Sequence, residues 1–351
     1  MSHLPTRFRT LDSLRGVAAI VVALFHRDMK DVFSGYLAVD FFLVLSGFVL
    51  SHSYLYRERS ISVWSFIGKR LARLWPLHVA SIFLMYGLYY AIYRQAPFPK
   101  HCNLTTFLQN LALVQNIGLP PQIWSWNYPS WSISIEFWIN VLFITCITRR
   151  TRNSTLLALA ALGLGIILWQ TGHLNTNYKN YFTFFNSGLI RGLASFFLGI
   201  LSYRLFLAYR DHGGIRKFAN VLELTCIPIT LLLLFASKLG YAQWELLAPF
   251  LFLFMVPLFA FEHGIVSRLL RPIDYLGTIS YSIYLGHLTV FLFLGWKPLR
   301  EMVPAGLNGP LAILLLLLYS HVTYRCIELP GQRVMRSLFG YMVRSKTDTG
   351  P

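Results

Sequence analysis

Residues 10–26 read TLDSLRGVAAIVVALFH, an apolar segment that carries two strongly polar side chains, Arg15 and His26. Eleven residues at about 100° each complete roughly three helical turns, so both side chains lie on one face of a helix, about 16 Å apart along its axis. A guanidinium and an imidazole at hydrocarbon depth are costly, which favours a functional site. The alternative is a snorkelling arginine and a histidine at the membrane boundary.

The composition extends this membrane assignment to the whole chain. The 351 residues are 55% hydrophobic and only 13% charged, with a mean hydropathy of +0.53, which indicates a polytopic membrane protein rather than a soluble one. We predict an all-α helix bundle in residues 1–335, with a disordered cytoplasmic tail at 336–351. About ten segments have the length needed to cross ~30 Å of hydrocarbon, namely 10–28, 36–55, 74–94, 130–148, 154–171, 188–208, 220–237, 245–262, 275–295 and 309–327.

The net charge of +17 is explained by membrane topology rather than by nucleic-acid binding. With ten spans and the N-terminus inside, twenty of the thirty-one Lys and Arg residues fall in cytoplasmic segments and seven in external loops. This asymmetry predicts that both termini are cytoplasmic, with some attraction to anionic lipid headgroups and anionic cytoplasmic ligands. The four cysteines show no CxxC or Cys/His ligand spacing, so we expect no metal site.

Four ionisable residues come out at one level in the outer half of the bundle. If the first span begins on the cytoplasmic side, His26 lies about 22 Å deep, and Glu136 lies about 9 Å below the outer boundary. Asp40 and His287 come out at similar depths. A carboxylate from Asp40 or Glu136 can fix the tautomer of His26 and raise its basicity, as a general base requires. Alternatively, either carboxylate caps a helix or pairs with Arg191.

The cytoplasmic half carries a different chemistry. Arg70 and Arg73 stand three residues apart just before Pro76, and Arg15 lies about one turn inside the same membrane face. Such planar groups suit bidentate capture of phosphates, although membrane topology alone also places basic residues there. Asp12 is positioned to hold Arg15. The small step Ser46-Gly47-Phe48 lets a slender ligand or another helix approach the backbone.

Several motifs together resemble the acyltransferase-3 family of integral-membrane acyltransferases. They are LDSLRGVAA at 11–19 with Arg15 and His26 in an Arg-x10-His pattern, FFxxxSGF at 41–48, Arg-x2-Arg at 70–73 followed by Trp-Pro, WSISIE at 131–136, LGTISYSIYLGH at 276–287, and Glu328-Leu-Pro330.

The resemblance implies transfer of an acyl group, in first place acetyl from acetyl-CoA, to a hydroxyl of a carbohydrate or lipid-linked glycan in the bacterial inner membrane. It implies that Arg15 and His26 are essential and that Arg70, Arg73 and Glu328 are important. Acyl-CoA would be held by the arginines and pass Ser46 and Gly47, and His26 would act as general base or carry the acyl group. A separate periplasmic partner could handle the acceptor. Alternatives are transfer of a longer acyl group such as succinyl, or a transporter or flippase of envelope intermediates.

Overall fold

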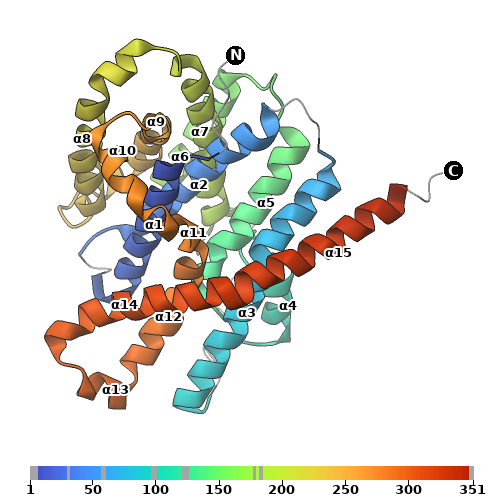
Figure 1. The fold of residues 1–351 in the computed structure, drawn as a ribbon, viewed down its shortest axis with the longest axis vertical. Helices are drawn as coiled ribbons and strands as arrows, with labels where there is room; N and C mark the ends of the chain where they lie inside the picture. The colour runs from blue at the N-terminus through green and yellow to red at the C-terminus, as the bar shows by residue number, and fades with distance from the viewer. Residues whose placement is uncertain are drawn as a thin grey trace. The chain divides into compact units, whose positions relative to one another are not determined.

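A computed structural model describes residues 7–29, 32–56, 61–95, 101–120, 126–176, 179–181 and 185–347, and these are almost wholly helical (Figure 1). The strands of the described residues are β1 (Asn180–Tyr181) and β2 (Phe185–Asn186), which pair antiparallel. The prediction of an all-α membrane bundle is therefore confirmed in its class.

The chain forms two compact units. Unit 1 comprises residues 1–58, 148–177 and 189–281, and unit 2 comprises residues 59–147, 178–188 and 282–351. The helices of unit 1 are α1 (Arg9–Leu24), α2 (Ala38–Leu50), α6 (Asn153–Gln170), α7 (Ser187–Tyr209, from residue 189), α8 (Gly213–Phe235), α9 (Ala248–Ala260), α10 (Ile265–Leu270) and α11 (Tyr275–Thr278). Those of unit 2 are α3 (Val63–Tyr93), α4 (Leu104–Leu111), α5 (Trp131–Cys146), α12 (Ser280–Gly295, from residue 282), α13 (Lys297–Met302), α14 (Ala305–Thr323) and α15 (Leu329–Thr347).

Seven helical segments of the described chain are long and apolar enough to cross a membrane, and each overlaps a predicted span. They are Gly35–Leu55, Val63–Tyr93, Asn153–Gln170, Ser187–Tyr209, Gly213–Phe235, Ala242–Ala260 and Ala305–Gly340. The other three predicted spans also form helices: α1 continues directly into the π-helical turn Phe25–Met29, and α5 follows directly on the 3-10 turn Tyr128–Ser130. Helix α12 is apolar but has only 16 residues. A helix of that length reaches about 24 Å, less than the hydrocarbon thickness.

In unit 1, small residues bring α2 and α7 into backbone contact. A Cβ on Gly47 would overlap the carbonyl oxygen of Phe196, and a Cβ on Gly199 would overlap that of Val44. The next residue of α2, Phe48, is buried, and its ring makes edge contacts with neighbouring aromatic rings at 5.2 to 5.6 Å. The step at 46–48 is thus a helix-packing site, the alternative that the sequence left open.

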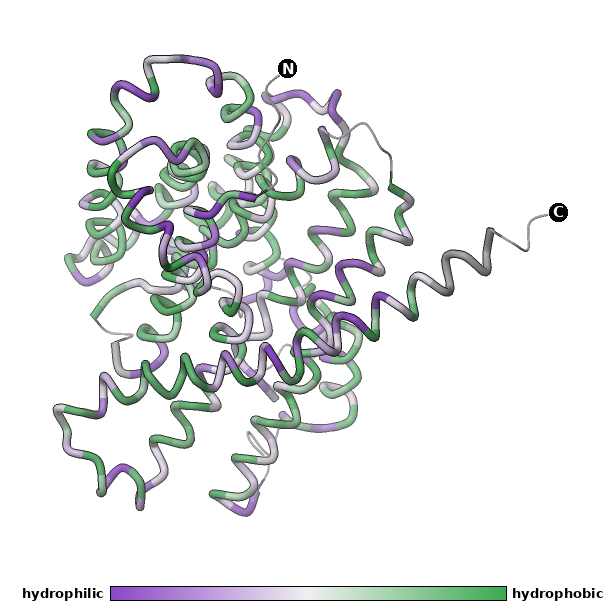
Figure 2. The backbone as a smooth tube through the Cα atoms, viewed as in Figure 1, coloured by the Kyte–Doolittle hydropathy of each residue, from purple (hydrophilic) through white to green (hydrophobic). Residues whose placement is uncertain are grey.

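In unit 2, α14 and α15 run on as one long helix through a π-helical turn, Tyr324–Glu328 (Figure 1). Figure 2 shows hydrophobic residues dominating α14 and hydrophilic residues interspersed along α15. Helix α15 packs along α3. Residues 336–347, which we predicted as the start of a disordered tail, are therefore helical, and residues 348–351 lie outside the described part of the chain.

Candidate active site

His26 lies where the first helix leaves regular α geometry. Helix α1 ends at Leu24, and a π-helical turn, Phe25–Met29, carries the half-buried imidazole. The Nδ1 atom of His26 lies 3.0 Å from the carbonyl oxygen of Val22. Because a carbonyl oxygen only accepts, Nδ1 donates, and in the neutral ring the lone pair is then on Nε2. In the neutral ring, Nε2 is then the nitrogen that can accept a proton.

Asp40 is committed to a different group. Its fully buried carboxylate pairs with the guanidinium of Arg191, whose Nε lies 3.0 and 3.1 Å from the two carboxylate oxygens. Ser195 Oγ donates a further hydrogen bond to Asp40 at 2.9 Å. The structure therefore shows the Arg191 pair that the sequence had left as an alternative. The contact that the structure describes at His26 is with a backbone carbonyl, that of Val22.

Arg191 and Glu245 both bind Tyr36 and Leu174. The sequence did not reveal this network. Arg191 donates to the carbonyl oxygens of Leu174, at 2.8 Å, and Tyr36, at 2.7 Å. Glu245, also fully buried, accepts from the Tyr36 hydroxyl at 2.5 Å, from Ser34 Oγ at 2.6 Å and from the Leu174 N–H at 3.3 Å. These contacts fix the connection before α2 to α7 and to the turn before α9.

Arg15, in the N-terminal half of α1, contacts three acceptors. Its Nε lies 3.2 Å from the carbonyl oxygen of Gly277 and 3.1 Å from Ser280 Oγ, and its Nη2 lies 3.3 Å from Asp12 Oδ1. The predicted contact between Asp12 and Arg15 is present. Since the guanidinium already spans these three acceptors, its visible task is to fix α1 against α11.

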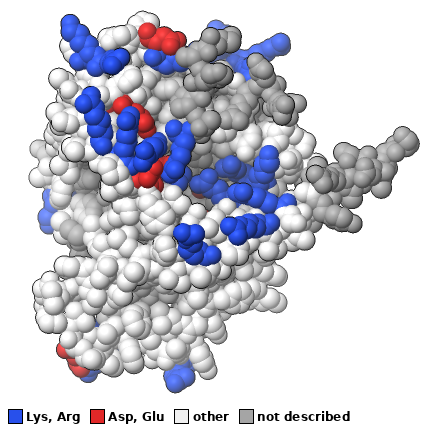
Figure 3. All heavy atoms as spheres, viewed as in Figure 1, with Lys and Arg blue, Asp and Glu red and all other residues white. Residues whose placement is uncertain are grey.

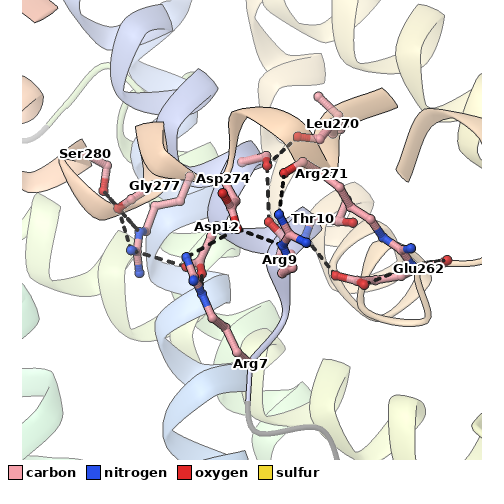
Figure 4. Close-up of polar contacts among 12 residues, drawn as sticks. Arg7, Arg9, Thr10, Asp12, Glu262, Leu270, Arg271, Asp274, Gly277 and Ser280 are labelled. Carbon is pink, nitrogen blue, oxygen red and sulfur yellow. Dashed lines mark hydrogen bonds and ion pairs between the residues drawn. The ribbon is translucent and has the colours of Figure 1, made fainter. Parts of the chain in front are cut away.

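Ion pairs next to Arg15 complete this end of α1 (Figure 4). Arg9 Nε lies 2.8 Å from Asp274 Oδ2, and this hydrogen bond holds the pKa of the Asp274 carboxyl below its ordinary value. Arg7 donates to Asp12 at 2.7 Å, which raises the pKa of Arg7. The start of α1 is thereby tied to the segment before α11.

The two arginines predicted to bind phosphate lie on α3 in unit 2. Helix α3 begins at Val63, where Ser62 caps it by accepting from the Ser65 N–H at 3.2 Å. Arg70 and Arg73 are half-buried, and the Arg70 guanidinium lies 5.5 Å from the centre of the Phe66 ring.

Three other predicted residues also belong to unit 2. Glu328 is buried in the π-helical turn and accepts from Ser282 Oγ at 2.8 Å and from Gln332 Nε2 at 3.1 Å. His287 is fully buried on α12, between the rings of its helix neighbours Tyr284 and Phe291. Glu136 is half-buried on α5. Among the described residues, no group of three or more His, Cys, Asp or Glu side chains could hold a metal ion.

Comparison with known proteins now defines the class. The acyltransferase domain family, acyltransferase-3, matches residues 8–322, so the chain belongs to this family, and the resemblance seen in its motifs is confirmed. The protein is a membrane acyltransferase by family and by its apolar helices.

Individual relatives add detail. The O-acetyltransferase OatA of Staphylococcus aureus is 24% identical over 96% of this chain and 59% of its own length. The peptidoglycan O-acetyltransferase OatA of Listeria monocytogenes is 21% identical over 92% of the chain and 55% of its own length. "Protein 2 in picA locus" of Rhizobium radiobacter is 34% identical over 44% of the chain and 91% of its own length. The chain thus spans little more than half of the OatA proteins. No solved structure matches it significantly.

Proposed function

We propose that this protein transfers an acyl group, in first place acetyl, from cytoplasmic acyl-CoA to a hydroxyl of a cell-envelope carbohydrate. Membership of the acyltransferase family supports the reaction class, and the OatA relatives support an O-acetyl product on an envelope glycan. The observation that carries the proposal is the half-buried imidazole of His26, whose Nδ1–H is taken by the Val22 carbonyl. That contact leaves the basic lone pair on Nε2.

The proposed reaction is a direct transfer. Nε2 of His26 accepts the proton of the acceptor hydroxyl while the oxygen attacks the thioester carbonyl. The bond between carbonyl carbon and sulfur breaks, coenzyme A leaves as thiolate and takes up the proton, and an ester remains on the acceptor. Arg70 and Arg73 bind donor phosphates, as planar guanidinium groups do. The proposal includes ten spans with cytoplasmic termini in the inner membrane, so that α3 begins on the donor side.

Labelled acetyl-CoA tests the reaction. Purified protein in lipid nanodiscs is incubated with radiolabelled acetyl-CoA and an extract of envelope glycans, and we expect label on the glycan. His26→Ala should lower the initial rate by about 10²-fold to 10⁴-fold, the usual share of a general base. His212→Ala removes an exposed imidazole of the same unit and should leave the rate unchanged. Full activity of a normally inserted His26→Ala protein would exclude the role of His26.

The label also separates the alternatives. A transporter or flippase would leave the acceptor unlabelled, and a succinyl transferase would label it only from succinyl-CoA. For the donor site, the double variant Arg70→Ala/Arg73→Ala should bind coenzyme A more weakly, and unchanged affinity would defeat that assignment. Mass spectrometry of envelope glycans from strains with and without the gene would then identify the acceptor by the loss of one acyl decoration.

A further inference from the structure

Helices α3 and α15 form an antiparallel pair with a defined register. A Cβ on Gly331 would overlap the Pro76 ring, and a Cβ on Gly68 would lie 2.9 Å from the Phe339 ring. Between these two contacts the residue number rises by eight along α15, from 331 to 339, and falls by eight along α3, from 76 to 68. Position 331 therefore lies opposite position 76, and position 339 lies opposite position 68.

The register decides which basic side chains share one side of the pair. Positions 68, 72 and 76 form the contact face of α3, and positions 331, 335 and 339 form that of α15, because residues four apart lie on one helix face. Lys69 and Arg73 each follow a contact position of α3, and Gln332 and Arg336 each follow one of α15. Each is thus rotated about 100° from a contact position, in the same sense. In an antiparallel pair, equivalent flanks lie on the same side, so Arg336 shares a side with Lys69 and Arg73.

These three cations also share one level along the pair. Arg336 lies opposite position 71, two residues from both Lys69 and Arg73, which is about 3 Å along the axis. The sequence of α3 and α15 contains no Asp or Glu, so neither helix supplies an opposing charge. Figure 3 shows that Lys and Arg side chains gather near the centre of one face of the protein.

A relay of hydrogen bonds along α15 positions Arg336. Its Nη2 donates to Gln332 Oε1 at 3.2 Å, and Gln332 Nε2 donates to the buried Glu328 at 3.1 Å. Ser282 fixes the other oxygen of Glu328. Glu328, Gln332 and Arg336 are spaced four residues apart, so they lie along one side of the helix. Through this relay the buried Glu328 carboxylate orients the Gln332 amide. That amide in turn binds the exposed guanidinium of Arg336.

We propose that Arg336, positioned by Gln332 and Glu328, forms with Arg73 and Lys69 a binding site for a phosphate group of the coenzyme A donor. Guanidinium and ammonium groups on two helices that themselves contain no Asp or Glu are suited to a phosphate anion. The site adds α15 to the donor site of the proposed function, on which this inference rests. Gln332 and Arg336 lie beyond residues 8–322, which the family matches.

A matched pair of variants tests the site. Arg336→Ala and Arg333→Ala each remove one exposed arginine from α15, but position 333 is rotated about 160° from the middle of the contact face, away from Arg73. Coenzyme A is titrated into the full chain in phosphatidylcholine nanodiscs. We expect Arg336→Ala to weaken binding about tenfold, as loss of a charge-assisted hydrogen bond does, and Arg333→Ala to have little effect. Equal affinities of the two variants would overturn the proposal.

Anionic lipid is the competing source of phosphate. If Arg336→Ala differs from Arg333→Ala only in nanodiscs that contain phosphatidylglycerol, the arginine serves lipid headgroups and the proposal fails. Gln332→Met tests the relay. It should weaken coenzyme A binding in the wild-type background and have no further effect in the Arg336→Ala background, whereas additive effects would overturn the positioning role. If wild type acylates glycans but Arg336→Ala binds coenzyme A normally, only this inference fails. If wild type binds no coenzyme A, the proposed function fails as well.

Discussion

Replacing Asp40 by Asn separates a structural role of this carboxylate from a catalytic one. The change keeps the shape of the side chain and removes the negative charge that faces Arg191. Both residues are almost fully buried, and the asparagine oxygen can still accept from Arg191 and Ser195. The perturbation is therefore the loss of charge compensation for a buried guanidinium.

The contacts of Arg191 determine how much stability Asp40→Asn loses. Breaking a buried ion pair usually costs about 3 to 5 kcal/mol, because the remaining charge is left uncompensated. In Asp40→Asn, Arg191 still has its hydrogen bonds to the carbonyl oxygens of Leu174 and Tyr36. Leu174 and Tyr36 are also held in place by hydrogen bonds to Glu245. We therefore expect the low end, about 3 kcal/mol, for Asp40→Asn.

Equilibrium unfolding in mixed micelles of mild detergent and dodecyl sulfate measures the loss. Asp12→Asn is the control, since it makes the same chemical change at a partly exposed ion pair of the same unit and should cost no more than about 1 kcal/mol. Acyl transfer per folded Asp40→Asn molecule should stay close to wild type. If Asp40→Asn is no less stable than Asp12→Asn, the buried ion pair between Asp40 and Arg191 does not stabilise the fold as predicted. A drop in transfer of about 10²-fold at unchanged stability would return Asp40 to the reacting centre.

Three further outcomes follow from contacts of the described residues. Gly47→Ala should destabilise the protein by about 1 to 3 kcal/mol, since the new methyl group overlaps the backbone of α7, whereas Gly87→Ala on α3 meets no atom within 4 Å and should not; thermal melts compare the two. Arg15→Lys should increase amide hydrogen exchange in α11, because an ammonium cannot reproduce the forked contact with that segment. The Asp274 carboxyl, whose pKa Arg9 lowers, stabilises the fold above its ordinary pKa of about 3.9, and this contribution is lost as the pH falls through the lower folded value. A charge-neutral Asp274→Asn variant should lack that acid-dependent step in unfolding titrations.

The sequence predicts the fold class because hydropathy and length are properties of single segments. Runs such as 309–327 and 220–237 have no other stable conformation in lipid than a helix. We predicted a disordered tail from residue 336, and the structure describes residues 336–347 as the end of α15. Helix α15 packs against α3 at Gly331 and Gly68, and this contact is invisible in either segment alone.

Local spacing also predicts part of the site. The contact between Asp12 and Arg15 follows from their separation of three residues on one helix. Asp40 and Arg191 are 151 residues apart, so the sequence could offer their pair only as an alternative. The relay from Glu328 through Gln332 to Arg336 has readable four-residue spacing, but its use depends on the register between α15 and α3.

The predicted spans that form α1, α5 and α12 carry Arg15 and His26, Glu136, and His287. Each leaves regular α geometry at one end: α1 continues as a π-helical turn, α5 follows the 3-10 turn Tyr128–Ser130, and α12 is separated from α11 by Ile279. In lipid, non-helical backbone is tolerated only where it is buried in protein or lines a water-filled cavity. Hydropathy measures how apolar a segment is and not where its backbone departs from the helix. In each of these three elements, an ionisable side chain and a departure from regular α geometry occur together, and hydropathy alone does not reveal this combination.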